Sequence, residues 1–209
     1  MRKTLGQIAT GLALVSAFTR VPTAEADMEL GHNALETARI KDSGIRTRAV
    51  SNVSVDGRLG SVGYWGMNEL TNLDTDTYFG RHVGTAGKND ARYRAAVVAK
   101  AIRDGVIDTK VGVRDTGLME KLGGYGWLDF VADKSALNVT GFFGKPLPYG
   151  LSGSLYQDVE LPFKGKPTAY TEMQIETPLN ERISAFGRAE IPGMNPGNGS
   201  YIVGIVMHN

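Results

Sequence analysis

The residues best suited to build a polar site lie on one side of two consecutive extended segments, 168–177 and 181–191. A three-residue loop at 178–180 would place Glu176 opposite Arg182 and Glu172 diagonal to Arg188, and opposite charges so placed across two strands attract each other. We therefore predict a charge network on the polar face of the sheet, lining a lumen or facing water. Its members are Tyr170, Glu172, Glu176, Arg182 and Arg188.

The same residue types could support acid–base or metal chemistry, but their spacing argues against it. Glu172 and Glu176 are separated by about 13 Å along a strand, which exceeds the carboxylate separation that glycosidases use. His32, His82 and His208 lack the spacing of zinc ligands. No phosphate-binding loop or nucleophile elbow is complete in the sequence. We predict that the protein is not an enzyme and holds no metal or cofactor.

Extended segments separated by Gly, Pro, Asn and Asp clusters follow one another from residue 46 to the end, a pattern typical of an antiparallel barrel or sandwich. The segment 91–103 contains good helix formers, but Arg92 and Arg94 alternate with Tyr93 and Ala95, which favours a strand. The predicted strands are 46–55, 58–69, 77–86, 91–103, 109–118, 125–132, 136–144, 150–161, 168–177, 181–191 and 200–208.

Two hairpins show how these strands alternate. A turn at 134–135 pairs Phe130 with Val139 and Ala132 with Leu137, and every pair on that face is apolar or glycine. The loop at 178–180 pairs Ile175 with Ile183. Because a slip of one residue would mix the two faces, their clean separation indicates a sheet with one apolar and one polar face.

The first residues have the order of a secretory signal peptide. Arg2 and Lys3 precede a mostly apolar run at 5–18, and a small-residue cleavage site follows at 24–26. We predict a signal peptide at 1–26, a tether or short helix at 27–45 and a β-barrel domain at 46–209. The tether prediction rests on Leu30, Ala34 and Ala38, which recur at helical spacing.

Composition narrows the function. The chain has 27 glycines in 209 residues and no cysteine, which suits an exported β-protein that is stable without disulfides. The formal net charge of +1 supplies no basic surface for nucleic acid, so we predict no nucleic-acid partner.

We predict an all-β fold, an antiparallel up-and-down meander of about 10–12 strands that most simply closes into a barrel. One hypothesis is an exported, non-enzymatic cell-envelope barrel of the outer-membrane type, a small pore, receptor or structural protein in contact with lipid. The alternative is a secreted or periplasmic soluble barrel or sandwich that binds a small apolar ligand inside. Alternation fits both. The predicted signal peptide favours the first hypothesis. Two features count against it: the sequence does not end in the aromatic residue that bacterial outer-membrane barrels usually carry, and the polar residues Gln157 and Thr171 interrupt the apolar face.

Overall fold

The computed structural model describes residues 27–30, 34–40, 44–57, 60–72, 74–88, 91–102, 105–193 and 196–208. The predicted signal peptide, residues 1–26, lies outside the described residues.

The described residues form 13 strands and three short helical segments. The strands are β1 (Asp27–Leu30), β2 (Ala34–Ile40), β3 (Gly44–Gly57), β4 (Gly60–Thr71), β5 (Asp74–Gly87), β6 (Tyr93–Ile102), β7 (Gly105–Asp115), β8 (Tyr125–Ala132), β9 (Ala136–Pro146), β10 (Ser152–Pro162), β11 (Thr168–Pro178), β12 (Ile183–Pro192) and β13 (Ser200–His208). The helical segments are α2 (Gly117–Lys121), η2 (Pro148–Gly150) and η3 (Pro196–Asn198).

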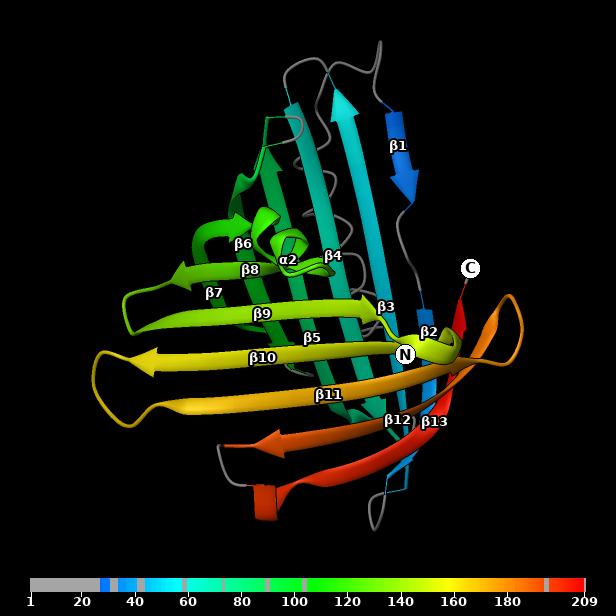
Figure 1. Cartoon of the computed structure of the whole chain (residues 1–209). Helices are drawn as coiled ribbons and strands as arrows, with labels where there is room; N and C mark the ends of the chain where they lie inside the picture. Colours follow the sequence, from blue (N-terminus) through cyan, green and yellow to red (C-terminus); the bar gives the residue numbers. More distant parts are fainter. Residues whose placement is uncertain are drawn as a thin grey trace.

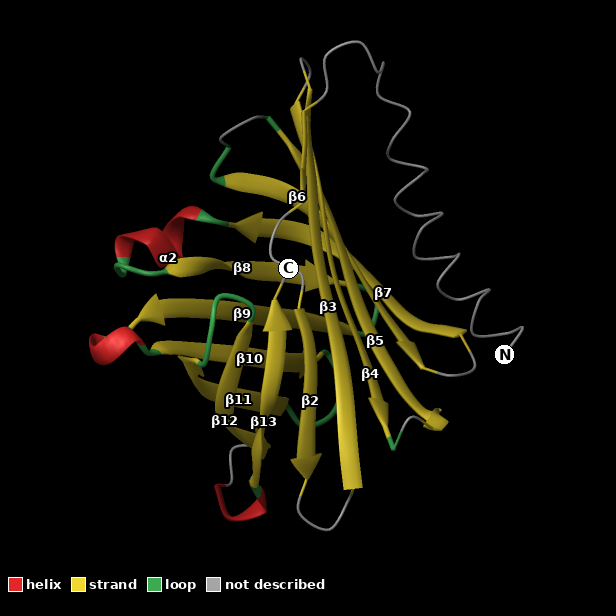
Figure 2. Cartoon of the chain, turned by 90° about the vertical axis from the view of Figure 1, so that its right-hand side faces the viewer, coloured by secondary structure: helices red, strands yellow, loops and turns green. Residues whose placement is uncertain are grey.

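The sheet closes on itself. Consecutive strands pair antiparallel from β2 to β13, and β13 pairs with β2, so these 12 strands form the predicted up-and-down barrel. β1 pairs with the end of β3 that extends beyond β2. In Figure 1, β3, β4 and β5 run steeply behind the nearly horizontal β8 to β11, so the strands of opposite walls cross. Figure 2 shows β2 and β13 side by side where the barrel closes.

The β8–β9 hairpin has the predicted register. Phe130 lies opposite Val139, and Ala132 lies opposite Leu137. Asp133 precedes the turn, and its side chain accepts hydrogen bonds from the backbone N–H groups of Ser135 and Ala136. The turn chemistry and the alternation therefore agree on one pairing.

The predicted register of the β11–β12 hairpin is wrong by four residues. Ile175 lies opposite Gly187 rather than Ile183. The chain turns later than predicted because the Asn180 side chain accepts hydrogen bonds from the N–H groups of Arg182 and Ile183. A shift of four is even, so each residue keeps the predicted face.

The prediction of a tether or short helix at 27–45 is also wrong. The segment contains β1 and β2, and β2 fills the gap between β13 and β3. Its apolar residues recur every fourth position, which places them on one face of a strand as well as of a helix. Ala34 and Ala38 pack inside the barrel with Ile202 and Val206. Pairing on both sides of β2 closes the barrel and decides for the strand.

The segments 91–103 and 109–118 each contain a strand. The segment predicted as a strand at 91–103 is β6, as predicted. The predicted strand at 109–118 instead spans Gly105–Asp115, and α2 begins at Gly117. Asp115 accepts hydrogen bonds from the N–H groups of Gly117 and Leu118, which ends the strand and starts the helix.

The barrel carries its apolar face outward. Large apolar side chains on alternate strand positions are exposed: Leu35, Ile45, Val111, Val113, Phe130, Leu155, Leu161, Met173, Ile175, Val203, Ile205 and Met207. The intervening positions hold the buried polar side chains, including Arg48, Arg81, Lys110, Arg114, Asp129, Asn138, Thr140, Arg188 and Glu190. Two small apolar clusters pack between these groups inside the barrel, one around Ile202 and one around Val83.

Candidate functional site

The predicted charge network is partly assembled inside the barrel. Glu172 on β11 lies 3.2 Å from the Nε of Arg188 on β12. Tyr170, two positions away on the same face, donates its hydroxyl to Glu172 at 3.2 Å. Arg188 also pairs with Glu36 of β2, and its guanidinium lies 4.7 Å from the ring centre of Phe186. These three predicted residues therefore share one interior cluster.

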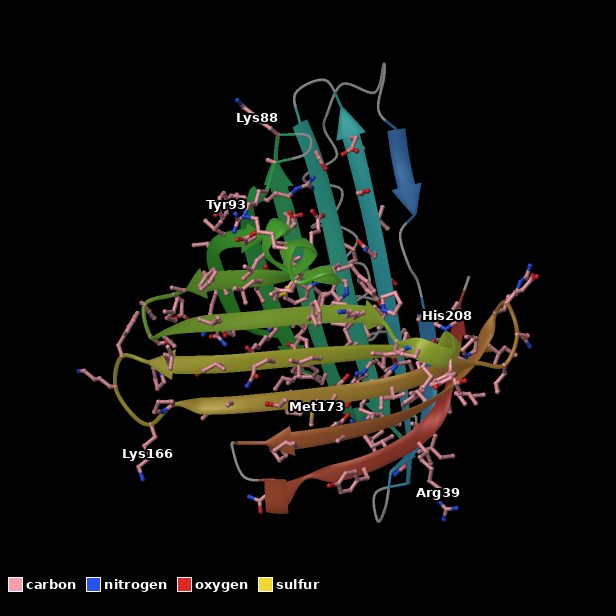
Figure 3. The ribbon with its side chains drawn as sticks, in the orientation of Figure 1. Arg39, Lys88, Tyr93, Lys166, Met173 and His208 are labelled. Carbon is pink, nitrogen blue, oxygen red and sulfur yellow. The ribbon has the colours of Figure 1, made fainter. Side chains whose placement is uncertain are left out.

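The other two predicted members lie elsewhere. Glu176 is 2.9 Å from the Nε2 of His208 at the end of β13, which Figure 3 labels. Arg182 is exposed in the β11–β12 loop, two positions beyond Asn180. The predicted pairing of Glu176 with Arg182 is wrong because the four-residue shift places Glu176 opposite Phe186.

Two arginines of β3, on the other side of the β2–β13 pairing that closes the barrel, complete the cluster. Arg48 contacts Glu172 of β11 at 2.9 Å and Glu69 of β4 at 2.9 Å. Arg46 contacts Glu190 of β12 at 2.6 Å. Glu69 lies directly opposite Arg48 on the neighbouring strand, whereas the pairs with Glu172 and Glu190 connect strands that lie several positions apart in the sheet. Arg46 and Arg48 already alternate with Thr47 in the sequence, but Glu172 and Glu190 come from strands that only the closed barrel brings near.

A second charged cluster links β10 to β5 and β6 across the interior of the barrel. Asp158 of β10 lies 3.4 Å from Arg81 of β5 and 3.2 Å from Lys100 of β6. Asp158 also accepts a hydrogen bond from Thr140 on the neighbouring strand. The buried Asp129 receives two hydrogen bonds from Arg114, at 2.7 and 2.8 Å. Opposite charges thus bridge the interior in two places, and each buried carboxylate named here has a cationic partner.

A row of aromatic rings borders these clusters. Trp127, Phe142 and Tyr156 lie directly opposite one another on β8, β9 and β10, and Glu172 continues the row on β11. The ring centres of Trp127 and Phe142 are 6.4 Å apart, and those of Trp127 and Tyr156 are 6.5 Å apart. Trp65 of β4 meets Trp127 edge-on, with the ring centres 5.8 Å apart. The predicted register of the β8–β9 hairpin already places Trp127 opposite Phe142, and the structure adds Tyr156 and Trp65 to them.

The clusters and the aromatic row enclose a cavity of about 960 Å³ inside the barrel. This volume is at the upper end of the range for small-molecule sites. The cavity reaches the barrel end where β8 and β10 begin and β13 ends, because Tyr125, Ser152 and His208 line it. Its lining combines rings (Trp65, Phe79, Tyr125, Trp127, Phe142, Tyr156, Tyr170), acids (Glu36, Glu69, Asp158, Glu172, Glu176, Glu190) and cations (Arg46, Arg48, Lys100).

Two pairs of polar side chains on the outer face form hydrogen bonds with each other. Gln157 of β10 lies opposite Thr171 of β11, and its amide donates to the threonine hydroxyl at 3.1 Å. The hydroxyl of Tyr64 on β4 lies 2.8 Å from the Nδ1 of His82 on β5. Such pairing lowers the cost of taking these groups out of water.

The β8–β9 turn holds a strongly stabilised carboxylate. The hydroxyl and backbone N–H of Ser135, together with the N–H of Ala136, donate to Asp133. These hydrogen bonds hold the pKa of Asp133 well below its usual range. The turn is therefore held by the ionised form of Asp133.

Among the described residues, no group of three or more His, Asp and Glu side chains is arranged to bind a metal ion. No helix in the described part of the chain is long and apolar enough to cross a membrane. Comparison of the chain with protein-family models, with curated proteins and with solved structures finds no match.

Proposed function

We propose that this protein is an exported, non-enzymatic barrel that crosses a cell-envelope membrane with its strands. The observation that carries the proposal is the direction of the two faces. Met173, Ile175 and Val203 are 46%, 57% and 68% exposed on the outside, whereas Arg81 and Asp129 are 1% and 0% exposed inside. Apolar side chains outside and ionic groups inside are the arrangement of membrane barrels.

The outer face of the wall from β8 to β13 supports this proposal in detail. Its alternating outward positions are apolar or small for most of their length, and Lys145 lies near the end of β9. Gln157 and Thr171, which interrupt this apolar face, form a hydrogen bond with each other. The strands of this wall have 8 to 11 residues, and a tilted spanning strand needs about 9–11.

The soluble alternative requires an apolar interior and a polar exterior. The charged interior clusters and the exposed apolar side chains favour the membrane barrel instead. A soluble barrel with this outer surface would expose an apolar band much larger than the patches that monomeric soluble proteins tolerate.

Within the envelope role, the interior favours a closed barrel with a binding cavity over an open pore. Ion pairs between Arg48 and Glu172, and between Arg81 and Asp158, join opposite sides of the lumen. Each acid in these bridges is tied to a cation, which suits a structural network rather than acid–base catalysis. The predicted signal peptide would supply the export that this location needs.

Cell fractionation tests the proposal. The mature protein should be recovered in the membrane pellet, be extracted by detergent and migrate differently on gel electrophoresis before and after boiling. A compact barrel that resists detergent without heat explains the shift in migration. Recovery of the folded protein from the soluble fraction without detergent would refute the membrane placement.

A further inference from the structure

The open end of the cavity brings aromatic faces and small polar groups together. Ser154 of β10 lies opposite Gly144, which itself lies opposite Tyr125, one row nearer to the opening than Trp127 and Phe142. On β11, Gln174 lies opposite Ser154, and Glu176 lies opposite Ser152. The neutral polar groups of the lining are Asn52, Ser152, Ser154 and Gln174. Rings on one wall thus adjoin hydrogen-bond donors and acceptors on the next.

The charges of the lining decide which ligands this cavity suits. A cationic ligand would meet Arg46, Arg48 and Lys100, and an anionic ligand would meet six carboxylates. Five of the six carboxylates are paired with arginine or lysine, and Glu176 contacts His208, so a charged ligand would compete with existing contacts. A wholly apolar ligand would strip water from polar groups without replacing its hydrogen bonds. A neutral ligand with apolar faces and many hydroxyl groups avoids all three costs.

We propose that the cavity binds a neutral saccharide. The C–H faces of the sugar rings pack on the row formed by Trp127, Phe142 and Tyr156. The hydroxyl groups of the sugar form hydrogen bonds with Gln174 and Glu176, which line the same cavity. Trp127 is held for this contact because Arg114 lies over its ring, 4.2 Å from the ring centre. The volume accommodates a short oligosaccharide.

This inference goes beyond the membrane placement and does not depend on it. The binding measurement uses the purified full chain, in detergent or in buffer according to where the protein fractionates. If no saccharide binds, the membrane placement is unaffected. If the protein fractionates as soluble, saccharide binding can still be measured.

The chain supplies its own probe, because it has only two tryptophans and both line the cavity. Titration with maltohexaose, cellohexaose and hexa-N-acetylchitohexaose should produce a saturable change in tryptophan fluorescence with at least one of the three. Tetramethylammonium and inorganic phosphate, probes of cationic and anionic ligands, should produce none. The absence of saturation with all three sugars up to millimolar concentrations, or saturation with either ion, would overturn the proposal.

Two adjacent phenylalanines provide a matched pair of variants. Phe142 lines the cavity, whereas Phe143 is on the opposite face of β9. Phe142→Leu should weaken saccharide binding roughly threefold to tenfold through the lost ring contact. Phe143→Leu should leave the affinity unchanged. Equal affinities in the two variants would place the sugar outside this cavity and contradict the assignment.

Discussion

Two single arginine substitutions on the outer face, one at the middle of a strand and one near its end, distinguish a barrel that faces lipid from one that faces water. Met173 lies at the middle of β11, is 46% exposed and is opposite Leu155 and Ala189. Thr177 is on the same strand and the same face, four residues nearer to the rim, and is also exposed. Figure 3 labels Met173 on this wall of the barrel.

The two positions differ in depth by an amount that matters in a membrane. Four residues span about 13 Å along a strand, and a tilt of about 40° reduces this to roughly 10 Å along the membrane normal. Met173→Arg should therefore destabilise a spanning barrel by about 2–4 kcal/mol, and Thr177→Arg by about 0–1 kcal/mol. On a water-facing surface, both changes should lie within about 0.5 kcal/mol.

Urea unfolding of the protein refolded into phosphatidylcholine vesicles, followed by tryptophan fluorescence, measures both free energies. The wild type and the two variants must unfold with the same denaturant slope for the comparison to hold. Equal and small effects of the two arginines would show that the outer face is not in lipid and would refute the membrane placement. A larger loss at Thr177 than at Met173 would contradict the assumed depth of the strand.

Three further predictions concern the interior and the turns. Glu172→Gln should lower the free energy of unfolding by about 1–3 kcal/mol, because two arginines lose a buried carboxylate partner, whereas Glu181→Gln in the exposed loop should change it little in the same urea titration. Because the pKa of Asp133 is lower in the folded state, its ionised side chain stabilises the fold at pH values above the unfolded pKa of about 4. This stabilisation is lost as the pH falls from the unfolded pKa through the folded pKa. Asp133→Asn should therefore destabilise at pH 7 but progressively less below about pH 4, and a difference from wild type that is independent of pH would refute this. Gly112→Ala should cost about 1–3 kcal/mol because its Cβ would meet the backbone of β8, whereas Gly187→Ala, which has open space, should be tolerated; equal thermal stability of the two variants would contradict the packing.

Several elements of the fold follow from the sequence. Alternation in 125–132 and 136–144, with a turn between them, predicted a hairpin whose register the structure confirms. The separation of apolar from polar residues in 168–177 and 181–191 also holds. The errors in the β11–β12 register and in the segment 27–45 have one physical source, because a strand pattern repeats every two residues. A four-residue slip, or a strand whose apolar residues recur every fourth position, satisfies that pattern equally well.

The candidate site was predicted only in part for a different reason. Tyr170, Glu172 and Arg188 come from adjacent strands, so local alternation could bring them together. Glu172 and Glu190, the acids that Arg48 and Arg46 contact across the barrel, come from strands far from β3 in the chain, and no local rule pairs them. Trp127 and Phe142 pair within the predicted hairpin, whereas Tyr156 joins the aromatic row through the register of β9 and β10.

The amino-acid sequence by itself determined that this protein has a two-faced antiparallel sheet, because alternation sets which side chains share a face. Only the tertiary structure decided which face points outward. Closing β3 onto β4 and β2 onto β13 encloses one face and exposes the other. The charged face is the enclosed one, because its arginines and carboxylates can pair across the lumen.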